Sequence, residues 1–238
     1  MRIPGLTSWL LLAPLLAVAA GISRPQAQTG KPIDDLCADR AESRRQRHCE
    51  VREDSIAGQH AIDLDPGRNG SVRVRGWERP EVHLRARVEA YAETQSRARE
   101  LASAVQVTTT AGRVRSDGPM TLDGEHWATS FYLDVPRNVR LAINTHNGGI
   151  SLEELSGTAM MRAVNGGITL RRVGGDLKGQ TRNGGIRVEL AGARWEGTGL
   201  DVETRNGGVR LTLPADYSAE LETGTVNGRV DIDFPVLI

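Results

Sequence analysis

Four arginines hold matching positions around a short motif that recurs in the second half of the chain. Arg182 and Arg205 stand directly before the Asn of an Asn-Gly-Gly segment, and Arg187 and Arg210 stand four residues after it. If successive copies stack at the spacing of β-strands, each pair lies about 5 Å apart. Like charges at that distance repel each other, and a bound anion reduces that repulsion. The four arginines therefore predict a face for an anionic partner such as an acidic polysaccharide.

Two carboxylates offer a different chemistry. Asp231 and Asp233 share one face of a predicted strand, and a carboxylate pair can carry out acid–base hydrolysis. A β-helix enzyme acting on polysaccharide is therefore the alternative function. Both sites have a simpler explanation: the acids can be solvated on an outer face, and Glu189 and Glu203 can neutralise the arginines.

Sequence motifs of catalysis and cofactor binding are absent. The chain contains no Gly-x-Ser-x-Gly, no His-Glu-x-x-His, no phosphate loop and no dinucleotide fingerprint. No Asp follows the paired glycines at the spacing of calcium-binding β-rolls. A polar loop with Asp123, Glu125 and His126 is the remaining cluster of titratable groups. We expect a protein that is not an enzyme, with no catalytic residues, no cofactor and no metal.

The motif around the arginines defines a repeat. Four Asn-Gly-Gly-hydrophobic segments and a fifth, Asn-Gly-Arg-Val, follow one another at steps of 18, 18, 23 and 21 residues. A period of this size indicates stacked, repeated β-structure. The asparagines that mark the predicted corners are Asn147, Asn165, Asn183, Asn206 and Asn227.

Each repeat reads as two short strands joined at its corner. Apolar residues recur six residues before the Asn and three and five residues after it, while the positions four and six residues after it are polar. A meander with Asn-Gly hairpins and a parallel β-solenoid both fit this pattern. We favour the solenoid, because parallel stacking turns recurring Leu, Thr, Ile and Asn into ladders, and stacked Asn amides can hydrogen-bond along the axis. The glycines are expected to supply positive φ at the corners.

The region before the repeats is predicted to be β-rich with one helix. Alternating apolar residues mark strands at 62–64, 71–75 and 82–88, and Asn69-Gly70 reads as a hairpin turn between the first two. Residues 94–105 place Ala and Leu side chains on one side at helical spacing, with Thr94 or Ser96 as the N-cap.

The N-terminal sequence predicts export. Residues 1–27 combine Arg2, an apolar run of 12 residues and small residues before a cleavage site, as in a signal peptide. Their removal takes away two arginines and no acid, leaving 28 basic and 30 acidic residues, which argues against nucleic acid as a partner. No other segment reads as a transmembrane span. Cys37 and Cys49, in an exported chain, predict a disulfide.

The repeats, preceded by 48–52 (HCEVR) and 74–77 (VRGW), resemble the bacterial "putative adhesin" β-strand repeat family, a domain of unknown function. The resemblance covers roughly residues 48–238. It implies a solenoid-like protein of the periplasm, cell envelope or extracellular space, with surface interaction or a structural role, and another envelope protein is a second candidate partner. It supplies no catalytic residues.

The predicted organisation has four parts: a signal peptide at 1–27, a disulfide-pinned linker at 28–50, a β-rich part with one helix at 51–136, and a mainly β, parallel solenoid at 137–238. The final apolar run has no polar cap. We therefore expect a truncated chain or another chain covering that end.

Overall fold

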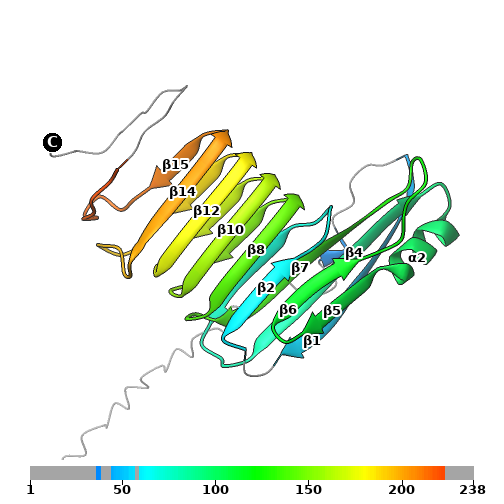
Figure 1. Ribbon diagram of the computed structural model, residues 1–238, viewed down its shortest axis with the longest axis horizontal. Helices are drawn as coiled ribbons and strands as arrows, with labels where there is room; N and C mark the ends of the chain where they lie inside the picture. Colours follow the sequence, from blue (N-terminus) through cyan, green and yellow to red (C-terminus); the bar gives the residue numbers. More distant parts are fainter. Residues whose placement is uncertain (1–35, 39–43, 57–58, 223–238) are drawn as a thin grey trace, which may run out of the picture. The chain divides into compact units, whose positions relative to one another are not determined.

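Two mixed β-sheets make up most of the described chain (Figure 1). The computed structural model describes residues 36–38, 44–56 and 59–222. In spatial order, the strands of the eight-stranded sheet are β1 (Gln46–Ile56), β4 (Val82–Ala92), β7 (His126–Pro136), β3 (Val72–Trp77), β9 (Ile150–Glu153), β11 (Ile168–Arg171), β13 (Ile186–Glu189) and β15 (Val209–Thr212). Those of the seven-stranded sheet are β14 (Gly199–Asn206), β12 (Asp176–Asn183), β10 (Thr158–Asn165), β8 (Arg140–Asn147), β2 (Ala61–Asp65), β6 (Arg113–Asp117) and β5 (Gln106–Thr110).

The repeat strands alternate between the two sheets and stack in parallel. Each longer strand before an Asn lies in the seven-stranded sheet, and each four-residue strand after it lies in the eight-stranded sheet. Neighbouring copies pair in register, so that Asn165 lies opposite both Asn147 and Asn183. Figure 1 shows β8, β10, β12 and β14 side by side and pointing the same way. Parallel pairing rules out a meander for these strands.

Apolar side chains from both sheets form one core between them. Burial alternates along each strand, so that every second residue faces the other sheet. The predicted apolar positions six residues before and three and five residues after the Asn are buried in the first three repeats, as Leu141, Ile150 and Leu152 illustrate. The residue four before the Asn also faces inward and adds Ile143 and Met161 to the core.

The corner asparagines form a hydrogen-bonded ladder, as the recurring Asn predicts. The Nδ2 of Asn165 donates to Oδ1 of Asn147 at 2.9 Å. The same bond joins Asn183 to Asn165 and Asn206 to Asn183, each at 2.8 Å. Asn227 lies outside the described residues. The ladder links successive corners by amide–amide bonds as well as by backbone pairing.

The corner glycines are needed for close approach rather than for positive φ, so the conformational expectation is wrong. None of the Asn-Gly-Gly glycines has a φ in the left-handed region. A Cβ on the first glycine, however, would lie well under 3.0 Å from a carbonyl oxygen of the neighbouring corner. For Gly184 that oxygen belongs to Gly166. The second glycine is less tightly enclosed: a Cβ would lie 2.9 Å from the next carbonyl oxygen at Gly167 and 3.1 Å at Gly149, but 3.5 Å at Gly185.

The predicted hairpin at Asn69-Gly70 is wrong, and this segment instead extends the stack. β2 and β3 lie in different sheets, and Asn69 forms a parallel bridge with Asn147. The Nδ2 of Asn147 donates to Oδ1 of Asn69 at 2.9 Å, which makes Asn69 the first rung of the ladder. Val72 pairs with Ile150 as the later repeats pair with one another.

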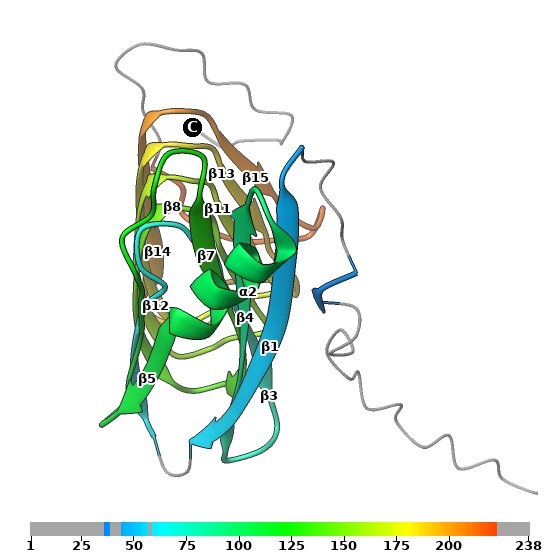
Figure 2. The ribbon, with the colours of Figure 1, turned by 90° about the vertical axis from the view of Figure 1, so that its right-hand side faces the viewer.

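The predicted helix is confirmed as α2 (Gln95–Ala104), capped by Thr94, whose side chain accepts from the Arg97 amide at 3.2 Å. Ala98, Leu101 and Ala102 are its buried residues, and they pack on Val88 and other residues of β4. Figure 2 shows α2 lying across the end of the two sheets, between β5 and β1. The helix thus covers the apolar interior at that end.

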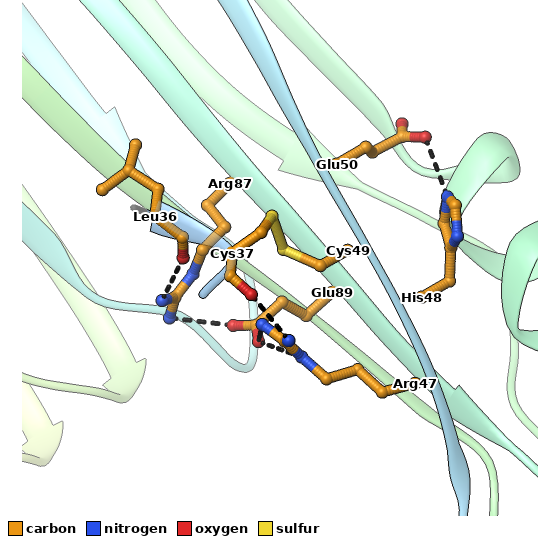
Figure 3. The surroundings of a disulfide bond; sticks show 8 residues. All are labelled: Leu36, Cys37, Arg47, His48, Cys49, Glu50, Arg87 and Glu89. Carbon is orange, nitrogen blue, oxygen red and sulfur yellow. Dashed lines mark hydrogen bonds and ion pairs between the residues drawn. A yellow bond between two sulfur atoms is a disulfide. The ribbon is translucent and has the colours of Figure 1, made fainter. Parts of the chain in front are cut away.

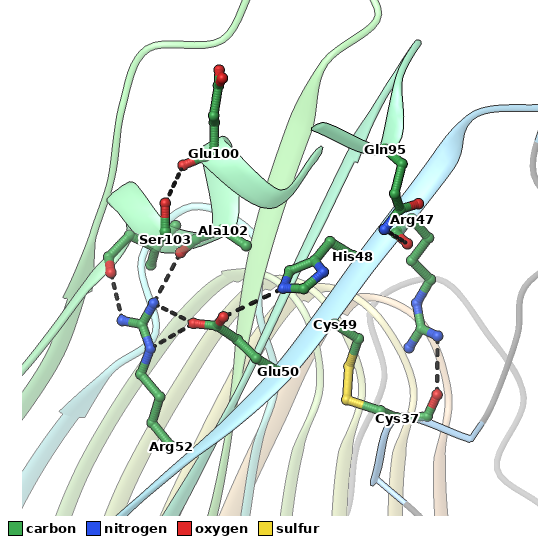
Figure 4. Close-up of polar contacts among 11 residues, drawn as sticks. Cys37, Arg47, His48, Cys49, Glu50, Arg52, Gln95, Glu100, Ala102 and Ser103 are labelled. Carbon is green, nitrogen blue, oxygen red and sulfur yellow. Dashed lines mark hydrogen bonds and ion pairs between the residues drawn. A yellow bond between two sulfur atoms is a disulfide. The ribbon is translucent and has the colours of Figure 1, made fainter. Parts of the chain in front are cut away.

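Arg52 of strand β1 attaches α2 to the sheet by hydrogen bonds (Figure 4). The guanidinium of Arg52 donates to the carbonyl oxygens of Val105 and Ala102, the latter at 2.9 Å, and is fixed by Glu50 at 2.6 Å. These carbonyls lie at the C-terminal end of the helix, where the Ala102 carbonyl also accepts from the Val105 amide at 3.2 Å, and a cation at a helix C-terminus is favourable. At the other end of α2, the Gln95 side chain donates to the Arg47 carbonyl at 3.3 Å.

The predicted disulfide is confirmed and fastens an N-terminal segment to β1 (Figure 3). Cys37 and Cys49 are bonded with Cα atoms 5.8 Å apart. Leu36 is 1% exposed, and its carbonyl accepts from Arg87 at 3.1 Å. Strand β1 begins at Gln46, inside the predicted linker. The predicted signal peptide lies outside the described residues, and within the described chain no helix is long and apolar enough to cross a membrane.

Candidate functional site

The outer face of the seven-stranded sheet carries rows of polar side chains. Because side chains alternate along a strand, residues one, three and five before each corner Asn all point away from the core. Parallel register then places equivalent residues of β8, β10, β12 and β14 in rows across the sheet. The row directly before the Asn reads His146, Val164, Arg182 and Arg205.

A shallow groove of about 570 Å³ runs over these rows. Its charged and amide-bearing residues come from four repeat strands and the nearby end of β2. They are Asp65, Asn144, Arg162, Gln180, Arg182, Glu203 and Arg205. Three arginines against two carboxylates give the groove a net positive charge. Guanidinium groups with amides beside them suit carboxylate or sulfate groups spaced along a polymer.

The structure divides the four predicted arginines into two pairs. Arg182 on β12 and Arg205 on β14 are neighbours in the groove. Arg187 on β13 and Arg210 on β15 are paired in register on the eight-stranded sheet. All four side chains are exposed. The two sheets face each other through the core, so their outer faces point in different directions. A ligand bound to one of these faces can therefore contact only one of the two arginine pairs.

Arg162 belongs to the groove and was missed in the sequence. It lies on β10, three residues before Asn165, and is exposed. The alternation of side chains along a strand could have identified it, because a residue three positions before the Asn lies on the same face as the residue one position before it. Aligning only identical residue types hides this, because the same row contains Asn144, Gln180 and Glu203.

The groove arginines are not neutralised by ion pairs within the described chain. Arg162, Arg182 and Arg205 make no salt bridge with any described residue. Glu189, considered as a neutralising partner, instead lies 3.6 Å from Arg171. Glu203 lines the groove without a salt bridge to a described residue. The positive charge of the groove therefore remains available to a ligand.

Several charged groups elsewhere on the described chain are paired with groups of opposite charge. Asp134 is buried and accepts from Arg75 at 3.0 Å and from Arg85 at 3.0 Å. Burial acts to raise the pKa of Glu154, but hydrogen bonds and charge from Arg172 and Arg137 outweigh burial and leave that pKa lowered. These pairs stabilise turns and strand faces, in contrast to the unpaired arginines of the groove.

Glu125 and His126 of the predicted polar cluster are both held by neighbouring side chains. In the loop before β7, two hydrogen bonds from Arg97 to Glu125, at 2.8 and 3.1 Å, lower the pKa of that carboxylate. The ring of His126 stacks on Tyr91 with centroids 4.5 Å apart. No group of three or more His, Cys, Asp or Glu suited to a metal occurs among the described residues. Asp231 and Asp233 lie outside them.

Several solved proteins are similar in structure at low sequence identity. A putative cell adhesion protein from Clostridium sporogenes has a TM-score of 0.35 and 9% identity, covering 68% of this chain and 99% of its own. A putative adhesin from Parabacteroides distasonis has a TM-score of 0.25 and 10% identity, with 68% and 97% covered. A putative lipid binding protein from Parabacteroides distasonis has a TM-score of 0.25 and 9% identity, with 68% and 96% covered. No family model and no curated protein matches the sequence.

Proposed function

We propose that this chain is an exported, non-enzymatic, adhesin-like β-repeat protein of the cell envelope. In this proposal the two sheets are the walls of a parallel β-solenoid, and the chain is related to the adhesin-like repeat proteins that its sequence resembles. The disulfide between Cys37 and Cys49 supports an oxidising location outside the cytoplasm. The in-register parallel strands and the Asn ladder support the solenoid.

The proposed ligand is an acidic polysaccharide bound along the groove of the seven-stranded sheet. The observation that carries this is the set Arg162, Arg182 and Arg205, which line one groove and form no ion pair with the described residues. The rows of the groove repeat across the strands at about 4.8 Å, the usual distance between neighbouring strands. A flexible polyanion can meet such rows with successive charges, and many weak contacts then add up.

The test compares two variants that remove equal charge from different sheets. The probe is polygalacturonate, with neutral dextran as the non-binding polymer, and the protein is the mature chain. We expect Arg182→Ser/Arg205→Ser to weaken binding about tenfold, which corresponds to roughly 1.4 kcal/mol. The matched control Arg187→Ser/Arg210→Ser should change the dissociation constant by less than about twofold, because those residues lie on the other sheet. Arg162→Ser should add to the loss in the first variant.

Two outcomes would contradict the proposal. If both double variants weaken binding equally, the attraction follows net charge and no groove is involved. If the parent protein does not retain polygalacturonate at low salt, the groove is not a polyanion site. Raising the ionic strength should weaken the parent's binding, because exposed charges are screened within about 8–10 Å.

A further inference from the structure

We propose that a second hollow, beside the groove, binds an acidic sugar ring at one end of the bound polysaccharide. This loop pocket has a volume of about 330 Å³ and lies where the turn between β2 and β3 meets the loop between β6 and β7. Arg68 and Asn69 line it from the turn, residues 119–121 from the loop, and His126 and Trp127 from the start of β7. The site rests on the polysaccharide as ligand and lies outside the groove arginines.

The loop pocket and the groove adjoin along one short turn. Asp65 and Gly67 line the groove, and the next two residues, Arg68 and Asn69, line the loop pocket. Because the Cα atoms of consecutive residues are about 3.8 Å apart, a polymer that lies in the groove can reach the pocket without leaving the surface. Asn69 is also the first rung of the Asn ladder, so the pocket lies at the β2 end of the repeats.

The lining of the loop pocket combines apolar surface with hydrogen-bonding groups, as a sugar ring requires. The C–H face of a sugar ring is apolar and packs on aromatic or thioether side chains, while its rim carries hydroxyl groups. Met120 is 97% exposed and, together with Trp127, supplies the apolar surface. Arg68 supplies a guanidinium and Asn69 an amide, both of which can donate to oxygen atoms of the rim. The volume has room for about one or two sugar rings.

Arg68 gives the loop pocket its preference for an acidic sugar. Its side chain is exposed and makes no hydrogen bond or ion pair with any described residue. A uronic acid carries a carboxylate on its ring, and a guanidinium binds a carboxylate through two parallel N–H···O bonds. A neutral sugar would leave this cation without a partner, so the pocket suits an acidic unit better than a neutral one.

The walls of the loop pocket are held in place by contacts within the chain. The indole Nε1 of Trp127 donates to the Pro119 carbonyl at 3.0 Å and so ties the loop to β7. A Cβ on Gly118 would lie 2.7 Å from atoms of the same indole ring, so the loop backbone packs directly against that ring. The Glu125 amide closes the far side of the loop by donating to the Leu122 carbonyl at 2.9 Å. A site that is formed in advance lowers the entropic cost of binding.

Titration of the full mature chain with digalacturonate, followed by heteronuclear NMR, tests this site. The reporter is the indole N–H of Trp127, and we expect its signal to shift as the sugar is added. Met120→Ala should raise the dissociation constant at least about fivefold, while Leu122→Ala, on the same loop but outside the pocket, should change it less than about twofold. Arg68→Ser should likewise raise it at least about fivefold, and the exposed Arg99→Ser on α2 is the control of equal charge.

Two results would overturn the loop pocket as a sugar site. The first is equal weakening of digalacturonate binding by Met120→Ala and Leu122→Ala, which would show that the pocket lining does not select the ligand. The second is digalacturonate binding that neither variant alters, together with equal loss of retention on phosphatidylglycerol vesicles in both. In that case the exposed apolar side chains of the loop contact a lipid surface rather than a sugar ring.

The loop pocket and the groove can fail separately. If the Trp127 signal does not move while polygalacturonate binding still depends on Arg182 and Arg205, the groove stands and the pocket is overturned. If digalacturonate binding depends on Met120 and Arg68 while polygalacturonate binding ignores the groove pair, the pocket is supported and only the groove is contradicted.

Discussion

The first glycine of each corner lies against a carbonyl oxygen of its neighbour, and this contact sets how closely two repeats approach. A methyl group there has no room, because the atom it meets is backbone and cannot rotate away. The role of glycine here is the absence of a side chain rather than its freedom of φ. The Asn beside it then reaches its counterpart in the next repeat at 2.8–2.9 Å.

Adjacent glycines therefore give a sharp comparison. We expect Gly184→Ala to lower the free energy of unfolding by about 2–3 kcal/mol, as overpacking does in a well-packed core. Gly185→Ala should cost less than about 1 kcal/mol, because its Cβ would lie at an ordinary contact distance of 3.5 Å. Chemical denaturation of the two variants measures the difference. Equal losses would mean that backbone conformation, not the close contact, requires glycine at the corner.

Residue types predicted the corners well wherever the motif was complete. The Asn ladder and the inward Ile and Leu positions follow from spacing, and the disulfide follows from two cysteines in a chain predicted to be exported. Asn69 was missed because the unit of β2 and β3 carries one extra residue: Ile62, rather than Asp63, pairs with Leu141. It also has Ser71 in place of a second glycine. The folded structure accommodates both departures, but they break the repeat pattern in the sequence.

The single described helix closes one end of the two sheets. Its existence was predictable, since Thr94 can cap it and its Ala and Leu residues share a face. Its position was not, because nothing local tells which strands its apolar face meets. The long-range contacts of Arg52, which is 50 and 53 residues from the carbonyls it binds, decide that position.

Removing the Arg52 guanidinium should loosen α2 without unfolding the repeats. We expect Arg52→Gln to lower the free energy of unfolding by about 1–2 kcal/mol, since it leaves two helix-end carbonyls without a charged donor. Amide exchange in 95–104 should accelerate more than in β10. Arg99→Gln on the exposed side of the same helix is the control and should be nearly neutral. A similar response in both variants would assign the effect to helix charge alone.

At the scale of the whole molecule, paired carboxylates make stability depend on pH. The pKa of Glu125 is lowered chiefly by its hydrogen bonds from Arg97, and that of Glu154 is also lowered, since Arg172 and Arg137 outweigh its partial burial. A carboxylate with a lowered folded-state pKa contributes stability above its unfolded pKa. That contribution is lost as the pH falls through the folded value. Stability should therefore be level above about pH 5 and decline as the pH falls below the ordinary value of 4.5.

Thermal melting of the parent and Glu125→Gln between pH 6 and pH 3 measures this effect. The variant should melt lower than the parent at pH 6, and the difference should shrink as the pH falls, because the parent's carboxylate becomes protonated as the pH passes through its lowered pKa. Melting curves that differ by the same amount at every pH would show that the Arg97–Glu125 pair does not contribute to the acid transition.

The parallel stacking has a consequence for how such a chain can change in length. Each repeat contacts mainly the one before and the one after it, and the extra residues of the longer step fall in the connection between β13 and β14. If one 18-residue repeat were duplicated in tandem, the new copy would pack on both sides against repeats of the same shape as those that the original copy contacts. Recombination within the gene could thus lengthen or shorten the protein by whole repeats while leaving the end covered by α2 unchanged.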